Sequence, residues 1–145
     1  MFKHILIPTD GSDLSAIAVK NGVRFAKEIN AEITGVTVTT PFHFMAVEAI
    51  EFSSTPEEHA ANARAQADRN LSVLKDEAAK AGVTCKLVHR SGVHPYEEIV
   101  KTAQDHNCDV IFLSSHGRRG IAALLLGSET QKVLTHTKIP VVVYR

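Results

Sequence analysis

The residues best suited to chemistry form a small-residue loop late in the chain. Residues 114–120 read Ser-Ser-His-Gly-Arg-Arg-Gly, and nine residues separate Gly117 from the pair Gly127-Ser128. Small residues let backbone N–H groups approach a phosphate, and the start of a helix presents unpaired N–H groups with a partial positive charge. Arg118 and Arg119 can add positive charge at the same place. The stretch therefore predicts an anion-binding loop between a strand and a helix.

The elements that must position this loop alternate along the chain as in a parallel α/β protein. Apolar or β-branched runs bounded by turn residues predict strands, and apolar residues spaced by three and four predict helices. We expect five strands joined by right-handed crossovers through four helices. The expected strands cover residues 4–8, 32–40, 84–90, 109–113 and 139–144, and the expected helices cover 14–29, 56–81, 95–107 and 128–134.

Asp10 follows the first expected strand and is the second candidate for a binding site. In open parallel sheets, ligands bind outside the carboxyl ends of the strands, where the strand order reverses. If the first and fourth strands are neighbours there, Asp10 and the loop from Ser114 to Ser128 face one crevice. The alternative for Asp10 is a helix cap or a turn residue.

Some helix boundaries carry strong local signals. Thr55-Pro56-Glu57-Glu58 predicts a capping box with proline in the first helical position, and Gly82 predicts the end of that helix, which should be the longest. Ser128-Glu-Thr-Gln131 predicts a second capping box. Residues 41–54 are irregular, and their aromatic side chains either cap the crevice or pack on the neighbouring helix; packing is favoured.

Composition limits the kinds of partner. At 145 residues we expect a single domain, and 16 Lys and Arg against 16 Asp and Glu leave no global field toward nucleic acid or membranes. The apolar runs are too short for a membrane span. Cys85 and Cys108 have no CxxC spacing, and no secretory leader precedes them, so we expect reduced thiols in a cytoplasmic protein.

Several familiar chemistries lack their motifs. The chain has no GxxxxGK[ST] and no GxGxxG after a strand, which argues against a P-loop hydrolase and a dinucleotide dehydrogenase. His116 stands alone without a paired nucleophile or carboxylate, so we predict no catalytic role for it. None of the histidines shows HxxxH or HExxH spacing, so we predict no metal site.

Four stretches together resemble the universal stress protein family over essentially the whole chain. They are Ile5-Leu-Ile-Pro-Thr-Asp-Gly-Ser12, Ser115-His-Gly-Arg-Arg-Gly-Ile121, Leu124-Leu-Leu-Gly-Ser128 and Pro140-Val-Val-Val-Tyr-Arg145. Nucleotide-binding members of that family carry Gly, two residues, Gly, nine residues, then Gly followed by Ser or Thr. Here Gly117, Gly127 and Ser128 match, while Ser114 replaces the first glycine. Serine fits that position unless the backbone there needs a positive φ angle.

The resemblance implies a fold, a ligand and a partner. The fold is an open, Rossmann-like, five-stranded parallel sheet with strand order 3-2-1-4-5 and helices on both faces. The ligand is ATP or a related adenine nucleotide, with or without Mg, and the partner is a second copy paired through the last strand at Val141, Val142, Val143 and Tyr144. The implied nucleotide-binding residues are Pro8, Thr9, Asp10, Val38, Ser114, His116, Gly117, Arg118, Arg119, Gly127, Ser128 and Glu129.

The implied role is a cytoplasmic, dimeric stress-response regulator with unknown protein partners. We expect at most slow ATP hydrolysis, because no residue is evident as a base near the γ-phosphate. The alternative is an interaction module of the same fold that does not bind nucleotide, and the replacement of glycine by Ser114 is the observation that motivates it.

Overall fold

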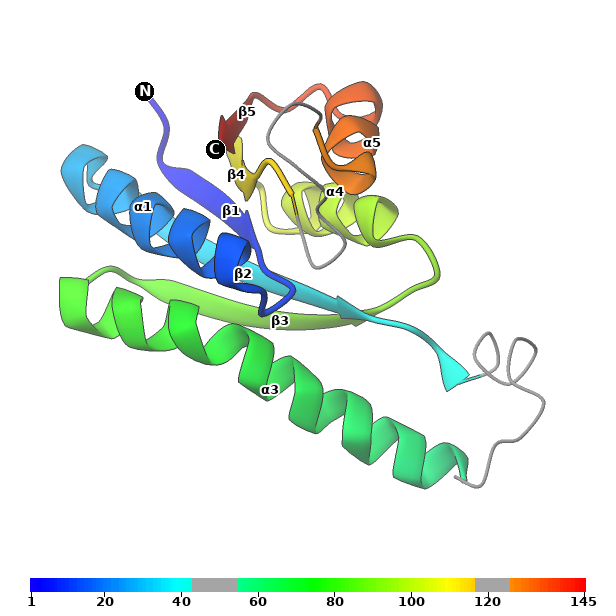
Figure 1. Cartoon of the computed structure of the whole chain (residues 1–145). Helices are drawn as coiled ribbons and strands as arrows, with labels where there is room; N and C mark the ends of the chain where they lie inside the picture. The colour runs from blue at the N-terminus through cyan, green and yellow to red at the C-terminus, as the bar shows by residue number, and fades with distance from the viewer. Residues whose placement is uncertain (43–54, 117–125) are drawn as a thin grey trace.

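A computed structural model describes residues 1–42, 55–116 and 126–145. Strands and helices alternate along the chain (Figure 1). Their bounds are β1 (His4–Pro8), α1 (Asp13–Ile29), β2 (Glu32–Thr39), α3 (Pro56–Ala81), β3 (Cys85–Ser91), α4 (Pro95–Asp105), β4 (Val110–Ser114), α5 (Ser128–His136) and β5 (Val141–Tyr144). The predicted order of elements is confirmed, and the predicted boundaries differ from these by at most two residues.

The five strands form one parallel sheet in the order β3-β2-β1-β4-β5, as predicted. Helices α1 and α3 cover one face of the sheet, and α4 and α5 cover the other (Figure 1). The strand order reverses between β1 and β4, so the carboxyl ends of these two strands, at Pro8 and Ser114, lie next to each other.

Alternate residues of β1 enter two separate halves of the core. Ile5 and Ile7 pack with α1 and α3, whereas Leu6 packs with α4 and α5, and all three are fully buried. Successive side chains of a strand point to opposite faces, so a strand covered on both faces must be apolar throughout. This explains why the first strand reads as an almost continuous apolar run.

Helix α3 has the boundaries that its local signals predict. Thr55 Oγ1 accepts the Glu58 N–H at 3.2 Å, and the Glu58 carboxylate accepts the Thr55 N–H at 2.9 Å. Gly82 ends the helix in the left-handed conformation, with φ of 68°. At 26 residues, α3 is the longest described helix, and its first turns extend past the sheet beside the end of β2 (Figure 1).

One local prediction is wrong. The second capping box does not form, because Gly127 rather than Ser128 is the N-cap of α5 and Gln131 Nε2 instead donates to the carbonyl of Leu126 at 2.7 Å. Helix α1 forms where the apolar repeat predicts it, although Leu14 and Ile17 of that repeat are both 49% exposed. Small residues occupy much of its buried face, including Ala18 and Gly22, because the helix packs closely on the sheet.

The predictions for residues 43–54, and those for Gly117, Arg118 and Arg119, lie outside the described residues. Phe42, at the boundary of the first gap, contacts the His59 ring edge-on with ring centroids 5.4 Å apart.

Candidate functional site

The turn after β1 is fixed by its own side chains. The Thr9 N–H donates to the carbonyl of Val36 at 2.9 Å, which continues the pairing with β2. The buried Thr9 hydroxyl oxygen accepts the Gly11 N–H at 3.2 Å and the Ser15 hydroxyl at 2.7 Å. Asp10 Oδ1 accepts the Ser12 N–H at 3.0 Å, so the carboxylate stands at the start of α1. Asp10 is thus a turn residue, a role compatible with a second contact to a ligand.

Gly11 brings this turn against α3. Its φ is +77°, a conformation that side chains disfavour, and a Cβ added there would overlap Oδ1 of Asn70. Asn70 is 6% exposed and donates from Nδ2 to the Thr37 hydroxyl at 3.0 Å. The turn that carries Asp10 therefore sits on a side chain that joins α3 to β2.

A hollow of about 440 Å³ opens beside this contact, between the end of β2 and the first half of α3. Two predicted nucleotide-binding residues, Asp10 and Val38, both line it. The remaining lining residues are Thr39, Thr40, His59, Asn62, Ala63, Gln66 and Asn70.

Most of the residues that line the hollow are polar, and few of them are charged. Asp10 is the carboxylate in it, and none of the described residues that line it is a lysine or an arginine. His59 Nε2 lies 3.0 Å from the carbonyl of Thr40, so this nitrogen carries a hydrogen and Nδ1 of a neutral ring can accept one. Such a lining suits a neutral, hydrogen-bonding ligand group better than a phosphate.

The second part of the site is the corner where β4 approaches the start of α5. The Gly127 N–H donates to the carbonyl of Ser115 at 2.7 Å, and the Thr130 hydroxyl donates to the carbonyl of Ser114 at 3.0 Å. A Cβ on Gly127 would lie 3.0 Å from that Ser115 oxygen and 3.3 Å from His116 Cα. These contacts hold the two ends of the predicted phosphate loop together.

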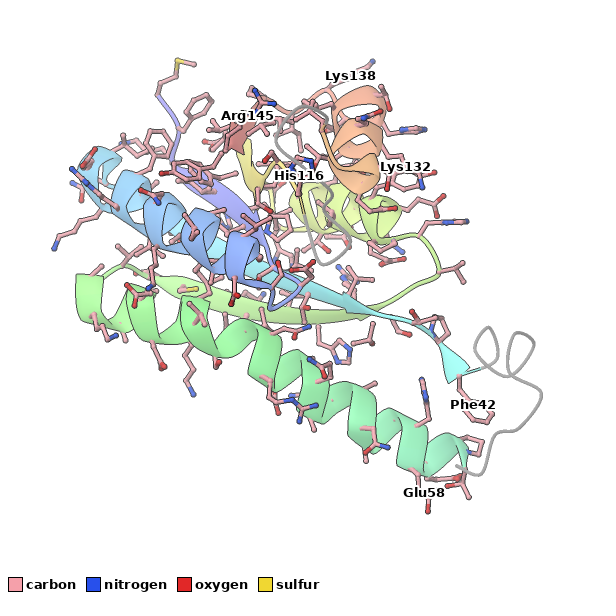
Figure 2. All side chains as sticks on the ribbon, viewed as in Figure 1. Phe42, Glu58, His116, Lys132, Lys138 and Arg145 are labelled. Carbon is pink, nitrogen blue, oxygen red and sulfur yellow. The ribbon has the colours of Figure 1, made fainter. Side chains whose placement is uncertain are left out.

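Ser114 does not need the conformation that favours glycine. It is the last residue of β4, and the described residues with positive φ are Gly11, Asn30, Gly82 and Asn107. Its hydroxyl donates to the carbonyl of His116 at 2.6 Å, which turns the chain as it leaves the strand. His116 lies at this corner (Figure 2), where its Nδ1 is 3.1 Å from the Ser115 hydroxyl.

Helix α5 begins at Ser128, as predicted, and Ser128 is exposed. The first N–H groups of a helix lack partners within the helix, so this end can receive an anion. The structure therefore keeps Ser114, His116, Gly127 and Ser128 at one corner.

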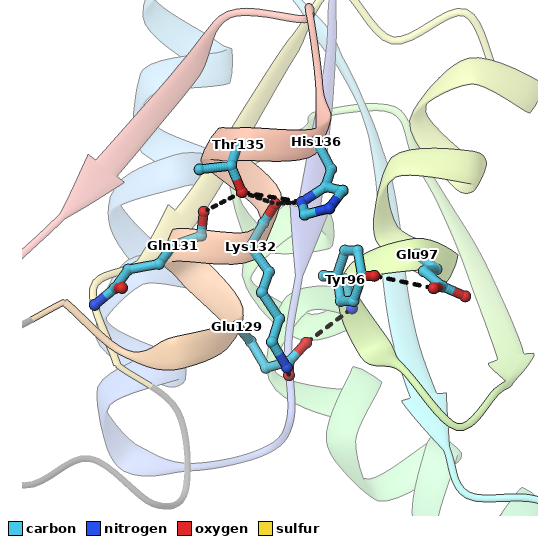
Figure 3. Close-up of polar contacts among 7 residues, drawn as sticks. All are labelled: Tyr96, Glu97, Glu129, Gln131, Lys132, Thr135 and His136. Atoms are coloured by element: carbon cyan, nitrogen blue, oxygen red, sulfur yellow. Dashed lines mark hydrogen bonds and ion pairs between the residues drawn. The ribbon is translucent and has the colours of Figure 1, made fainter.

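Glu129 is directed toward α4. Its carboxylate accepts the Tyr96 N–H at 2.9 Å and lies 3.2 Å from Lys132 Nζ (Figure 3). Helix α4 needs this acceptor, because its own N-cap, His94, makes no side-chain capping bond. The Tyr96 ring lies 4.7 Å from the ring of His136, and Lys132 Nζ lies 5.5 Å from the Tyr96 centroid. Glu129 therefore caps the neighbouring helix, a role that its place in the sequence does not indicate.

Sequence reasoning also missed the residues that α3 contributes. Asn62, Gln66 and Asn70 follow one another at intervals of four and face the hollow together. That interval places side chains on one face of a helix. The repeat of carboxamide side chains at this interval is therefore the sequence signal that could have indicated a polar face on α3.

In residues 1–42, 55–116 and 126–145, no three His, Cys, Asp or Glu side chains gather as a metal site would require. Over the same ranges, every helix is too short or too polar to cross a membrane. Cys85 and Cys108 are free, and burial raises the pKa of each thiol to about 11.

Comparison with known proteins gives a consistent result. The sequence profile described as the universal stress protein family matches residues 1–145. Universal stress protein MJ0531 of Methanocaldococcus jannaschii is 31% identical over 145 residues, which is 100% of this chain and 83% of that protein.

Solved structures of the same fold agree. The structure of MJ0577, a universal stress protein of the same organism, superposes with a TM-score of 0.81 at 31% identity and covers 99% of this chain and 95% of its own. A universal stress protein in complex with cAMP superposes with a TM-score of 0.69, covering 99% of this chain and 97% of its own. At 22% identity, the similarity to this second structure is evidence for a shared fold.

Proposed function

Because the chain belongs to the universal stress protein family, we propose that it binds an adenine nucleotide and acts as a cytoplasmic stress-response regulator. The observation that carries this proposal is that Asp10 and Val38 line one hollow, while Gly127 meets Ser115 at the corner after β4. β1 and β4 are neighbours in the sheet, so both parts lie at the same carboxyl edge. A universal stress protein with this fold has been solved in complex with cAMP, which supports the proposal that the fold can bind an adenine nucleotide.

The charges of the two parts suggest how the nucleotide lies. The base and ribose occupy the hollow, where Val38 and Ala63 offer apolar contact and the Asp10 carboxylate can accept from ribose hydroxyls. The phosphates lie at the start of α5, where Ser128 and the helix N–H groups favour negative charge. The opposite orientation would bring phosphate against Asp10.

Calorimetry with ATP, with and without Mg, tests this function on the full chain. We expect a single site per chain, weakened in Asp10→Ala and unchanged in Asp76→Ala, an exposed carboxylate later on α3. The absence of heat and of retention in equilibrium dialysis at millimolar ATP would reject nucleotide binding. It would favour the interaction module of the same fold.

We further propose that the regulator is a homodimer paired through β5. This strand is at the sheet edge, and its four residues are half-buried. The carbonyls of Pro140 and Tyr144 accept the N–H groups of Ile111 and Ser115. Val141 and Val143 alternate with them and therefore direct their backbone groups to the other edge of β5. Within residues 1–42, 55–116 and 126–145, no further strand pairs with this edge of β5. An edge strand of this kind can pair with a second copy.

Val143→Pro removes one outward N–H without removing a bond to β4. We expect sedimentation to show a dimer for the parent chain and a monomer for this variant, with circular dichroism unchanged. A parent chain that sediments as a monomer at all concentrations would reject the dimer.

A further inference from the structure

The carboxamide of Gln66 on α3 is held in one orientation by its neighbours. Arg69 donates to Gln66 Oε1 at 2.9 Å, and Gln66 Nε2 lies 2.7 Å from Asn70 Oδ1. A guanidinium can only donate, so the atom that faces Arg69 must be the oxygen. The nitrogen therefore faces Asn70, whose own Nδ2 donates to the Thr37 hydroxyl at 3.0 Å.

This chain of bonds runs from the surface to the buried end of the hollow. Asn70 at its inner end is 6% exposed and touches the turn at Gly11. Each amide is fixed by the next, which reduces the rotamer freedom that a ligand would otherwise have to remove. Gln66, which is half-buried, is thus organised before a ligand arrives.

These two bonds use half of the hydrogen-bonding capacity of the Gln66 amide. The nitrogen has two hydrogens and the oxygen has two lone pairs, and within the described residues each atom makes one of these bonds. One donor hydrogen and one acceptor lone pair therefore remain on the amide of a residue that lines the hollow. The Asn62 amide lies one turn earlier on the same lining.

This pattern is complementary to one nucleobase edge. Adenine presents an amino donor next to a ring-nitrogen acceptor, and a glutamine or asparagine amide pairs with both at once. In the same pose of the base, guanine and hypoxanthine present a carbonyl acceptor where adenine has the amino group, so the amide oxygen would face another oxygen. From this geometry, and resting on the proposed nucleotide function, we propose that Gln66 selects adenine over guanine and hypoxanthine by pairing with the base edge.

Competition calorimetry with ATP, GTP and ITP tests the assignment. We expect the parent chain to prefer ATP by about tenfold or more, the usual discrimination of a two-bond amide contact. Gln66→Leu should bring the three affinities within about twofold of one another by weakening ATP alone. Gln104→Leu, the same change at an exposed position of α4 on the other face of the sheet, should leave the preference intact.

Gln66→Glu supplies a second test that does not depend on loss of binding. A carboxylate accepts from the two adjacent N–H groups of guanine and repels the ring nitrogen of adenine, so GTP should gain relative to ATP. Thermal melting of each variant checks that the fold is retained.

The possible failures are distinguishable. If the parent chain binds none of the three nucleotides, the proposed function falls and this inference falls with it. If the parent binds ATP but Gln66→Leu and Gln66→Glu keep its preference, or if the parent has no preference, only the role of Gln66 is overturned.

Discussion

The two ends of the candidate site are built from different parts of the chain. Side chains form the hollow, where Gln66, Asn70 and Thr37 bond to one another. Backbone groups form most of the corner, where the Gly127 N–H meets the carbonyl of Ser115. A side chain can distinguish one ligand from another by its donors and acceptors, whereas backbone N–H groups accept any suitable anion.

This difference separates two properties of the proposed function. Changes at the corner should alter the affinity for every nucleotide alike, because all of them carry the same phosphates. Changes at Gln66 in the hollow should alter which base is preferred. A corner variant that changed base preference, or a Gln66 variant that weakened all nucleotides equally, would break the distinction.

The largest effect is expected from Gly127→Val at the corner. Its Cβ would already lie 3.0 Å from the Ser115 oxygen, and the branched methyl groups would separate β4 from the start of α5. Loss of two charged hydrogen bonds at about 1.5 kcal/mol each would weaken ATP and GTP by about 100-fold alike. Calorimetry measures the affinities for ATP and for GTP.

Gly82→Ala is the control for this change. Gly82 has φ of 68° but nothing within 4 Å of an added Cβ, so the variant should lose about 1 kcal/mol of stability without any change in affinity. If Gly127→Val bound ATP as the parent does, the corner would not be the phosphate site.

Gly11→Ala, in the turn against the hollow, ranks second. The left-handed φ and the overlap with the Asn70 amide should together cost about 2 kcal/mol of unfolding free energy, measured in urea. Displacement of Asn70 releases Gln66, so we also expect the preference for ATP over GTP to decrease. An unchanged preference in a folded variant would show that the turn does not support the hollow.

Sequence patterns predicted the fold well because most of its determinants are local. Thr55 and Glu58 form their capping box at an exposed helix start, where few other contacts compete. The same pattern at Ser128 and Gln131 failed, because the bond from Gly127 to Ser115 places the helix start one residue earlier than the pattern requires. Tertiary contacts decided the second case.

The site was only partly predictable for the same reason. Asp10 and Val38 could be placed from strand ends and family resemblance, and the structure brings both to one hollow. The role of Gln66 depends on Arg69, Asn70 and the approach of Gly11, which joins segments far apart in the sequence. Glu129 was expected beside the ligand, but its bond to Tyr96 depends on how α4 and α5 pack.

Glu129→Ala should have the third largest effect, on stability rather than on base preference. Removing the carboxylate leaves the Tyr96 N–H at the start of α4 without its acceptor, which should cost about 1 kcal/mol in urea unfolding. Glu129→Gln retains an acceptor oxygen and should lose less. Equal losses in the two variants would mean that the pairing with Lys132, and not the cap, is the important contact.

The smallest effect concerns His89 and acid pH. Its Nε2 lies 2.7 Å from the hydroxyl of Thr39, which lines the hollow. Burial, and next the nearby Arg64 guanidinium, lower the His89 pKa below its ordinary value of 6.5. The imidazole of His89 therefore binds a proton more readily in the unfolded chain than in the folded chain. The contribution of neutral His89 to stability is complete above the unfolded pKa of 6.5 and decreases as the pH falls below that value.

Urea unfolding at about pH 7.5 and about pH 5.5 measures this dependence, with His89→Gln as the variant that cannot titrate there. The parent chain should lose more stability on acidification than the variant does. Because Thr39 belongs to the hollow, acid should also reduce the preference for ATP over GTP in the parent more than in the variant. Identical losses of stability in the two proteins would exclude His89 as a source of acid sensitivity. An equal decrease in the preference for ATP over GTP would show that protonation of His89 does not affect the hollow.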